Sequence, residues 1–546
     1  MIDANSIKEV IEELSFVRLK SDIKEENSYK NFKIEIQTDK ETPPLEWKVR
    51  IFPYYPFKVA EREPIYFYNT SLMEYPHIMR SGFVCLHTPK VEDPKMQFWM
   101  DLSRLKDWVD KYYVRKEKDD HYEELVVEHA QVNDIYYNFF YSDTIKQLNH
   151  GDYGIVDLVK LLPGYHGTNR MGTFMVNAFY SKKNNEPYYC QWEPDSSKQR
   201  KSVGIYCFLN GIPSKYDKFI MEQYSELEDL FSWSQKEFLA KWLQNKSLSK
   251  RVPLFCGYKI PNGETRWQVA LLKPNTIKIK KERCGGRSIK IYSFIKEKID
   301  WATTYNCSYE YFFGRGCLPS ALAENKILIL GIGAIGSMVA TTLTRNGARY
   351  LDFQDIDLKE PGNICRSNYD FLSGISDKTY ELCSILQGIS PFVHCNIPNN
   401  ILDSRIKRSM DDEKLKTEIQ KELNEYDIIF DCSTDNGLMH ALDRLQLRGK
   451  LVNLSISNHA EELVCAIGSN IAKTVSFIFQ HIIESDSTDM YYPTGCWSPT
   501  FKASYNDIAT KLQFALKHII SMLSSVEPES NFYISETNDG LIINRL

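Results

Sequence analysis

The sequence predicts a multidomain protein of α/β and α+β domains, and three observations support this fold class. The chain has 546 residues, which corresponds to roughly three or four domains at about 100–200 residues each. Roughly the first 110 residues combine a helical stripe with alternating apolar runs, the pattern of a small α+β domain. After residue 325, apolar strands alternate with helices, which indicates a doubly wound, mainly parallel sheet. We therefore expect domains at residues 1–130, 131–311 and 312–546.

The first domain should contain a helix, an antiparallel meander and a second helix. Ser6 to Glu9 has the pattern of a capping box, and an apolar stripe with helical spacing follows it. Alternating runs near residues 32–36, 47–51 and 64–68 predict the strands of the meander. Leu102 to Val109 predicts the second helix.

The middle domain carries few signals. We expect strands at Ile205–Leu209 and Thr276–Ile279 and a helix at Gln235–Leu243. The region shows no catalytic motif and no internal repeat.

The last domain has the clearest pattern. Lys326–Leu330 predicts a buried strand that runs into a glycine-rich loop, and a helix follows to about Asn346. Later strands are expected up to Asp355 and at Asp427–Phe430, Lys450–Ser455 and Glu461–Ile467. A helix at Asp507–Leu523 and a hairpin turning at Asp539-Gly540 are expected near the end.

The overall composition excludes several classes of protein. Hydrophobic residues make up 43% and the net charge is −5, which argues against a broadly basic nucleic-acid-binding protein. The sequence lacks both a run of about 18 apolar residues and a secretory signal, so we expect no membrane span. The 13 cysteines form no Cys-x-x-Cys pair, so neither a zinc knuckle nor a redox dithiol is indicated. Their odd number, without a secretory signal, predicts reduced thiols and a cytoplasmic protein.

The glycine-rich loop predicts a nucleotide site. Gly331, Gly333 and Gly336 lie between a strand and a helix, where glycines allow a tight turn and the helix start offers N–H groups to phosphate. Asp355 comes nineteen positions after Gly336, where a carboxylate would meet a ribose hydroxyl. This motif alone is also compatible with an NAD-dependent oxidoreductase.

Further polar residues favour ATP over NAD. Asn363, Arg366 and Lys378 follow the second strand closely, and together they suit a triphosphate better than a pyrophosphate bridge. Asp435 follows another strand and could hold Mg²⁺ at the carboxyl end of the sheet.

This ordered set resembles the Rossmann-like adenylation domain of ubiquitin-activating and MoeB/ThiF-like enzymes. The resemblance implies that Asp355 binds ribose, that Asn363, Arg366 and Lys378 contact phosphates, and that Asp435 binds the metal. It also implies an arginine upstream of the first strand that reaches the phosphates, often across a homodimer, and Arg315 is the candidate. ATP and Mg²⁺ are therefore the expected cofactors.

Two cysteines are candidate nucleophiles. Cys496 lies in a Gly-Cys-Trp-Ser-Pro-Thr-Phe segment after the core strands, where the activating enzymes carry their acyl-accepting thiol. Cys465 is its rival, but its apolar strand predicts a buried thiol with a raised pKa.

Cys85 is the second candidate nucleophile. The order Tyr-Pro-Phe, Tyr-Pro-His77-Ile and Gly-Phe-Val-Cys85-Leu resembles the ubiquitin-conjugating fold over residues 1–112. The family's usual asparagine falls on His77, whose imidazole could still donate to an oxyanion. His87 is a further possible helper. A noncatalytic binding module remains the alternative for this domain.

The two thiols together predict a relay from an acyl-adenylate to Cys496, then Cys85, then an amine of a target lysine. The fused order resembles the conjugation proteins of bacterial type II CBASS anti-phage operons. That resemblance implies that the substrate is the C-terminus of a cGAS/DncV-like nucleotidyltransferase and that the adenylation domains form a homodimer. It also suggests that the middle region is a linker domain with an inactive adenylation-like fold. A ubiquitin-like or sulfur-carrier protein is the alternative substrate. No membrane or direct nucleic-acid partner is expected.

Overall fold

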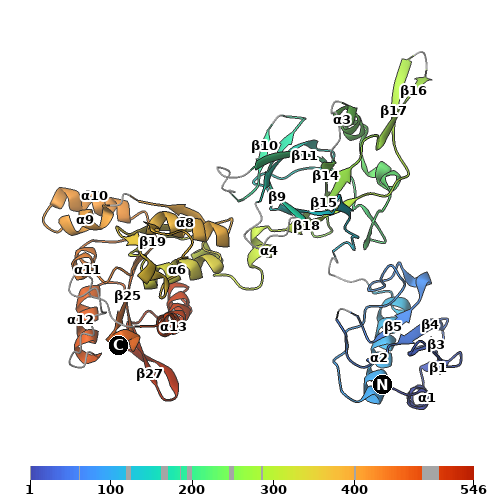
Figure 1. The fold of residues 1–546 in the computed structure, drawn as a ribbon, viewed down its shortest axis with the longest axis horizontal. Coiled ribbons are helices and arrows are strands. Elements are labelled where there is room, and N and C mark those ends of the chain that lie inside the picture. The colour runs from blue at the N-terminus through green and yellow to red at the C-terminus, as the bar shows by residue number, and fades with distance from the viewer. Residues whose placement is uncertain are drawn as a thin grey trace.

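The computed structural model forms three regions that follow one another along the chain (Figure 1). It describes residues 2–60, 62–117, 124–161, 170–184, 186–192, 200–244, 251–284, 287–398, 401–482 and 503–546. Within these residues, no helix is both long enough and apolar enough to cross a membrane.

The N-terminal region is a helix, an antiparallel sheet and a second helix, as expected. Its elements are α1 (Ala4–Glu13), β1 (Val17–Leu19), β2 (Lys24–Glu26), β3 (Tyr29–Ile36), β4 (Leu45–Ile51), β5 (Ile65–Tyr68), the 3₁₀ turn η1 (Thr70–Leu72), α2 (Pro94–Trp108) and the π-helical turn η2 (Val109–Val114). The strands pair in the order β1-β3-β4-β5. Alternate residues of β4 are buried, which is why one face of the sheet packs on the helices.

The start of α1 differs from the sequence prediction. The helix begins at Ala4, and its N-cap is Asp3, whose carboxylate accepts the backbone N–H of Ser6 at 2.8 Å. A helix takes the cap that satisfies its first free N–H groups, and Asp3 does so one turn before the predicted box. Ser6 is therefore a residue of the first helical turn.

The central region is a closed β-barrel that contains both parallel and antiparallel strand pairs. Its elements are β6 (Gln131–Val132), β7 (Ile135–Tyr141), β8 (Tyr153–Lys160), β9 (Met171–Ser181), β10 (Pro187–Tyr189), β11 (Arg200–Phe208), β12 (Ser214–Lys215), β13 (Phe219–Ile220), η4 (Tyr224–Leu230), α3 (Trp233–Gln244), β14 (Val252–Lys259), β15 (Thr265–Leu272), β16 (Ile277–Cys284), β17 (Arg287–Phe294) and β18 (Trp301–Asn306). The main sheet runs β9-β8-β11-β14-β15-β18-β7, and β7 pairs back to β9.

This architecture contradicts the suggestion of an adenylation-like middle domain. Neighbouring strands such as β8 and β9, and β14 and β15, pair antiparallel. A doubly wound sheet needs parallel strands joined by crossover helices, whereas α3 is the one α-helix among the described residues of this region. The strands predicted near residues 205 and 276 and the helix predicted at 235–243 are present as β11, β16 and α3.

The C-terminal region is the expected doubly wound domain. Its first half contains α4 (Tyr309–Phe313), α5 (Ser320–Ala323), β19 (Lys326–Leu330), α6 (Ala334–Arg345), β20 (Tyr350–Gln354), β21 (Leu358–Lys359), α7 (Pro361–Ile364), β22 (Ser376–Asp377), α8 (Lys378–Ile389), β23 (His394–Asn396), α9 (Leu402–Arg408) and α10 (Glu413–Leu423). Its second half contains β24 (Ile428–Asp431), α11 (Asn436–Asp443), β25 (Lys450–Ser457), η5 (Asn458–Ala460), β26 (Glu462–Ile467), α12 (Ile471–Ile482), α13 (Tyr505–Leu523), β27 (Phe532–Thr537) and β28 (Gly540–Arg545).

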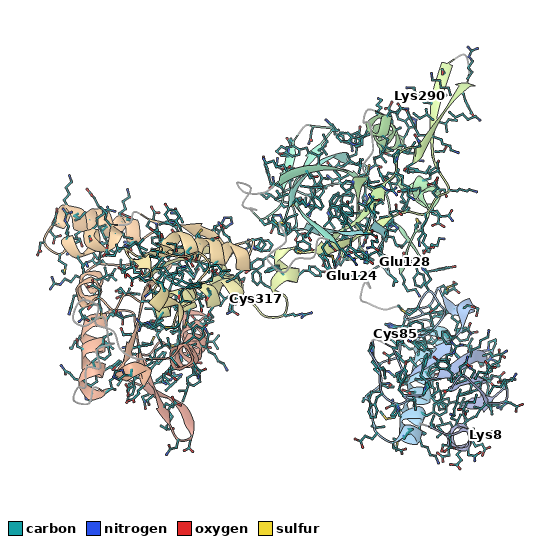
Figure 2. The ribbon with its side chains drawn as sticks, in the orientation of Figure 1. Lys8, Cys85, Glu124, Glu128, Lys290 and Cys317 are labelled. Carbon is teal, nitrogen blue, oxygen red and sulfur yellow. The ribbon has the colours of Figure 1, made fainter. Side chains whose placement is uncertain are left out.

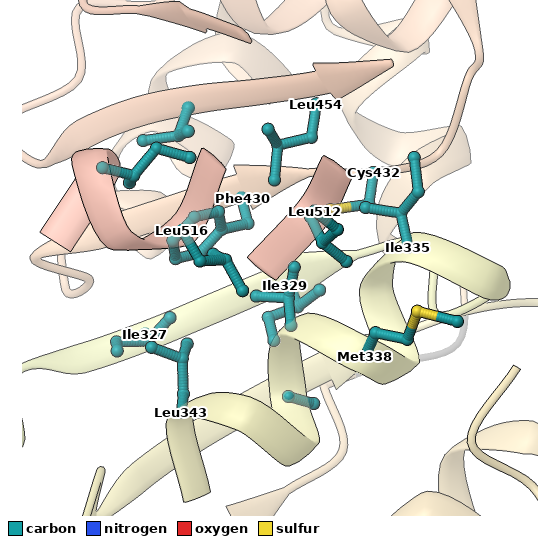
Figure 3. Close-up of a cluster of buried hydrophobic side chains, with 14 of the residues drawn as sticks. Ile327, Ile329, Ile335, Met338, Leu343, Phe430, Cys432, Leu454, Leu512 and Leu516 are labelled. Carbon is teal, nitrogen blue, oxygen red and sulfur yellow. The ribbon is translucent and has the colours of Figure 1, made fainter. Parts of the chain in front are cut away.

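Its sheet has the order β23-β20-β19-β24-β25-β26-β27-β28, with parallel pairs from β23 to β25 and antiparallel pairs from β25 to β28. Both faces are covered by helices, so β19 and β24 are buried along almost their whole length. Figure 3 shows part of this core, in which Ile329 and Phe430 of the sheet pack near Met338 of α6 and Leu512 of α13.

Aromatic packing joins the central and C-terminal regions. Phe392, which follows α8, lies 6.0 Å from Trp192 of the central region and 6.3 Å from Phe313 of α4, between ring centroids. Phe392 is 1% exposed, so these contacts form a continuous apolar core across the junction.

Candidate active site

The three glycines of the loop between β19 and α6 have different structural tasks. Gly331 has φ +77°, and a Cβ there would lie 2.5 Å from the Cα of Ser433. A Cβ on Gly336 would lie 2.0 Å from the carbonyl oxygen of Gly331. A Cβ on Gly333 would meet no atom within 4 Å. Gly331 and Gly336 thus allow close packing, whereas Gly333 leaves space in front of the helix.

That space is a cavity of about 420 Å³ at the carboxyl ends of the parallel strands. It contains the residues predicted from the second strand onward, namely Asp355, Asn363, Arg366 and Lys378. Its other lining residues are Gly331, Gly333, Ala334, Ile335, Asp357, Ser367, Tyr369, Cys432, Ser433, Thr434, Ile456 and Ile508. Gly336 lies behind this lining, in contact with Gly331.

Asp355 holds the glycine-rich loop as well as facing the cavity. One carboxylate oxygen accepts the backbone N–H of Ile332 at 2.9 Å, and the other accepts that of Asp357 at 2.8 Å. Burial raises the pKa of the Asp355 carboxyl above its usual range, although the nearby Lys378 ammonium opposes this shift. Asp357, whose side chain is 67% exposed, is the freer of the two carboxylates to meet a ligand.

The cationic side of the cavity is built by the start of α8. Asp377 caps this helix, which places Lys378 in its first turn. The Lys378 ammonium lies 3.0 Å from an Asp357 oxygen and 3.6 Å from an Asp355 oxygen. Lys378 is 6% exposed, so its charge is directed into the site. Together with Arg366 and the N-terminus of α6, this charge suits a polyphosphate.

Asn363 shapes the opposite wall of the cavity. Its side-chain oxygen accepts the backbone N–H of Glu360 at 2.8 Å, which completes a capping box around α7. This hydrogen bond fixes the turn that leads from β21 to Arg366.

Asp435 lies outside the lining of the cavity. It caps α11, and its second carboxylate oxygen pairs with Lys407 of α9 at 2.9 Å. Burial would raise the pKa of Asp435, but the hydrogen bond from Lys407 lowers it below its usual range overall. Among the described residues no cluster of three His, Cys, Asp or Glu side chains could hold a metal ion. One carboxylate is nevertheless compatible with Mg²⁺, which takes other ligands from water and phosphate.

Arg315 is exposed in the segment between α4 and α5 and does not line its own chain's cavity. The fold brings to this site two residues that were not predicted from the sequence. The Tyr369 hydroxyl donates to the carbonyl of Ile332 at 2.7 Å, and Lys407 reaches Asp435 from a helix 28 residues away. Neither residue belongs to a local pattern that could have revealed it.

Cys85 lies beside a small pocket of the N-terminal region with a half-buried thiol. Its sulfur is 3.9 Å from Nε2 of His87, and its backbone N–H donates to the carbonyl of His77 at 2.7 Å. His77 has φ +60°, and its Nε2 lies 3.0 Å from the hydroxyl of Tyr112. The fold therefore places both predicted histidines next to Cys85, His87 through its ring and His77 through its backbone.

The other cysteine predictions have different outcomes. Cys465 is fully buried in β26, and burial raises the pKa of its thiol far above the usual range, as expected. Cys496 lies outside the described residues.

Comparisons with known proteins identify the C-terminal domain. Residues 315–449 match the ThiF family, so this part of the chain is a ThiF-family domain. The chain is similar to the ATP-dependent ubiquitin transferase-like protein Cap2 of Enterobacter hormaechei subsp. hoffmannii, with 26% identity over 239 residues, 42% of this chain and 38% of that protein. It is also 26% identical to the uncharacterized protein y4oA of Sinorhizobium fredii over 225 residues, which are 38% of this chain and 37% of that protein. The alignments thus span less than two-fifths of these relatives' lengths.

The chain also has weak similarity to solved structures. E. coli MccB with ATP is 17% identical with a TM-score of 0.29, and the match covers 41% of this chain and 64% of that chain. PaaA is 13% identical with a TM-score of 0.28, and the match covers the same shares of the two chains.

Proposed function

We propose that this protein uses ATP to activate the C-terminus of another protein and then transfers it to an amine through two of its own cysteines. The observation that carries this proposal is the cavity of the ThiF-family domain, where Asp355, Arg366 and Lys378 converge on the start of α6. An NAD-dependent dehydrogenase would not need both Arg366 and Lys378 lining a cavity beside the same helix terminus.

The first step is adenylation. The substrate carboxylate attacks the α-phosphate of ATP, the bond to the β-phosphate breaks, and pyrophosphate leaves. Arg366 and Lys378 stabilise the negative charge on the phosphates, and Asn363 positions the wall of the site. The ribose is held by Asp357 or Asp355. Mg²⁺, held near Asp435, would neutralise further phosphate charge.

The second step moves the acyl group to thiols. The Cys496 thiolate attacks the acyl-adenylate and AMP leaves, and the Cys85 thiolate then displaces Cys496. Both exchanges need reduced thiols, such as the cytosol maintains. Thioester exchange between similar thiols is nearly balanced, so the cleavage of ATP to AMP and pyrophosphate drives the sequence.

The third step is aminolysis at a ubiquitin-conjugating-like N-terminal domain. Its helix–meander–helix order and the half-buried thiol of Cys85 support this assignment. His87, 3.9 Å from the sulfur, is the candidate base that accepts a proton from the thiol or the incoming lysine. His77 replaces the family's asparagine, and its fixed backbone supports the loop on which the thioester would lie.

The partners follow from the same reasoning. The order of the conjugating-like and adenylation domains, which resembles that of type II CBASS conjugation proteins, points to the C-terminus of a cGAS/DncV-like nucleotidyltransferase as substrate, in anti-phage defence. The similarity to an ATP-dependent ubiquitin transferase-like protein supports ATP-dependent transfer of a protein C-terminus. A patch of large exposed apolar side chains beside β21 and β22 supports a homodimer through this domain, and Arg315 would then serve the partner's site. The patch contains Ile356, Leu358, Phe371, Leu372, Ile375 and Tyr380.

The relay is tested by intact mass under non-reducing conditions, with ATP, Mg²⁺ and a cGAS/DncV-like nucleotidyltransferase as the substrate protein. Wild type, Cys85→Ala and Cys496→Ala are compared, with Cys317→Ala as the control because Cys317 is exposed in the same ThiF-family domain (Figure 2). We expect a reducible adduct that remains on Cys496 in Cys85→Ala and is absent from Cys496→Ala. The Cys317→Ala control should behave as wild type.

Other results would contradict parts of the proposal. An adduct on Cys85 in the Cys496→Ala variant would overturn the order of transfer. Pyrophosphate release without any adduct would indicate that the protein is an adenylyltransferase with a noncatalytic N-terminal domain. A substrate-dependent change in nicotinamide absorbance would instead support the oxidoreductase.

A further inference from the structure

A hairpin of the central region reaches into the loop next to Cys85. Lys218, between β12 and β13, donates from its ammonium to the backbone carbonyls of Tyr75 at 2.5 Å and Ile78 at 3.1 Å. Lys218 is 8% exposed, so both hydrogen bonds are shielded from water. Charge-assisted hydrogen bonds in such surroundings are among the stronger polar contacts in proteins.

A second contact runs in the opposite direction. Arg80 donates from its guanidinium to the carbonyl of Ile220 at 3.1 Å and forms an ion pair with Glu222. The same guanidinium lies 5.4 Å from the ring centroid of Phe219 in β13. Each of the two regions therefore places a cationic side chain against backbone carbonyls of the other region. Figure 2 shows Cys85 in the part of the N-terminal region that lies toward the central region.

The loop between these contacts determines the backbone position of Cys85. Within it, the carbonyl of Pro76 accepts the indole N–H of Trp108 at 3.0 Å, and that of His77 accepts the N–H of Cys85 at 2.7 Å. The carbonyls before and after this pair are those that Lys218 binds. Four consecutive carbonyls thus accept hydrogen bonds, two from the N–H groups of Trp108 and Cys85 and two from the single ammonium of Lys218.

The conformation of this loop needs such support. His77 has φ +60°, a backbone conformation that costs a residue with a side chain free energy unless its surroundings hold it. The turn of the supporting hairpin is itself fixed, because Val126 donates its N–H to the carbonyl of Lys218 at 2.8 Å and pairs with Phe219 at the start of β13.

We propose that Lys218 is a positioning residue for the proposed chemistry at Cys85, so that the central region forms part of the conjugating site. By binding the carbonyls on both sides of Pro76 and His77, Lys218 holds the loop that fixes the Cys85 backbone. Transfer to the amine then requires the docked arrangement. The inference rests on the proposed function for the transfer, whereas the docking contact is independent of it.

The test compares the full-length wild type with Lys218→Ala, Lys218→Arg and Lys215→Ala. Lys215 is a matched control, because it lies on the same hairpin and pairs with Glu226 within the central region. Hydrogen exchange of residues 75–85 reports the docking. Single-turnover loss of the Cys85 thioester to free lysine reports the transfer, and loading of Cys496 in the same samples reports the upstream chemistry.

We expect Lys218→Ala to raise exchange in residues 75–85 and to slow transfer from Cys85 about tenfold, since small displacements of reacting groups reduce rates strongly. Loading of Cys496 should be unchanged. Lys218→Arg, which retains the donors, should recover most of the rate, and Lys215→Ala should match wild type. This rescue separates positioning from a general loss of stability.

Two results would overturn the inference. Unchanged exchange in Lys218→Ala would show that the docking contact does not hold the loop. Increased exchange with an unchanged or faster transfer rate would show that docking does not position Cys85 for the reaction. If wild type forms no thioester on Cys85, the proposed function fails at that step, and so does the positioning role, while the exchange data still decide the docking contact.

Discussion

Alanine at Gly336 and alanine at Gly333 should damage the protein in two different ways. A Cβ at position 336 would lie 2.0 Å from the carbonyl oxygen of Gly331, a backbone atom that no side-chain rotation can move. Reaching an acceptable separation needs a shift of about 1 Å between α6 and the loop, and such overpacking costs about 3 kcal/mol at the upper end of its usual range. For a domain of this size, that is a decrease of about 6–12 °C in Tm.

Gly333→Ala should leave stability almost unchanged, since its added methyl group meets no atom within 4 Å. The methyl group would instead occupy the space in front of the N-terminus of α6, where we place the phosphates. Losing one or two hydrogen bonds to a charged group should weaken nucleotide binding by about 10- to 100-fold.

Thermal unfolding and calorimetric titration with a nonhydrolysable ATP analogue distinguish the two effects. Gly362→Ala is the control, because its Cβ would also meet nothing within 4 Å and Gly362 does not line the cavity. Wild-type affinity in Gly333→Ala would refute the location of the phosphates. A wild-type Tm in Gly336→Ala would refute the steric argument.

Three further substitutions test charged groups of the same domain. Glu381→Gln should cost about 3–5 kcal/mol at pH 7, because it leaves buried Lys359, 2.8 Å away, without its carboxylate. Burial acts to raise the pKa of Glu381, but hydrogen bonds from Lys359 and Ser376 lower it below its ordinary 4.5. A lowered pKa means that this contribution to stability is present above pH 4.5 and is lost as the pH falls through the pKa of Glu381 in the folded protein. The free energies of unfolding of wild type and Glu381→Gln, measured in urea, should therefore converge in acid. A difference that stays constant with pH would exclude the ion pair as the source of the added stability. Asp435→Asn retains a capping side chain but should raise the Mg²⁺ concentration needed for pyrophosphate release about tenfold. Lys407→Met should lower that concentration, because it removes a cation that competes with Mg²⁺ for the Asp435 carboxylate. Equal Mg²⁺ dependence in all three proteins would exclude Asp435 as a metal ligand.

The C-terminal domain was predictable because its signals are local. Lys326–Leu330 is a continuous apolar run followed at once by the glycines, and β19 forms over those residues. Asp355, Asn363 and Lys378 follow within about fifty residues, at the ends of elements whose order fixes their place at one edge of the sheet. No long-range information was needed to bring them together.

The central region was not predictable for the opposite reason. Its barrel closes through β7, which pairs with β9 and also with β18, far away in the sequence. Nothing in a single strand specifies which distant strand it will join, so its alternating apolar pattern predicts strands but not their order. The helix start at Asp3 instead of Ser6 shows the same limit on a smaller scale, since both residues are good caps and packing of the whole helix decides between them.

The sequence by itself determined the order of the domains, the strand–loop–helix unit of the nucleotide site and the cysteines worth testing, because these depend on residues close together in the chain. Only the tertiary structure decided that Lys407 holds Asp435 and that Lys218 holds the loop beside Cys85. Lys218 is about 140 residues from the carbonyls it binds, and its role depends on how two domains pack. Contacts of that kind arise from shape and burial across the fold, which no local pattern of residues records.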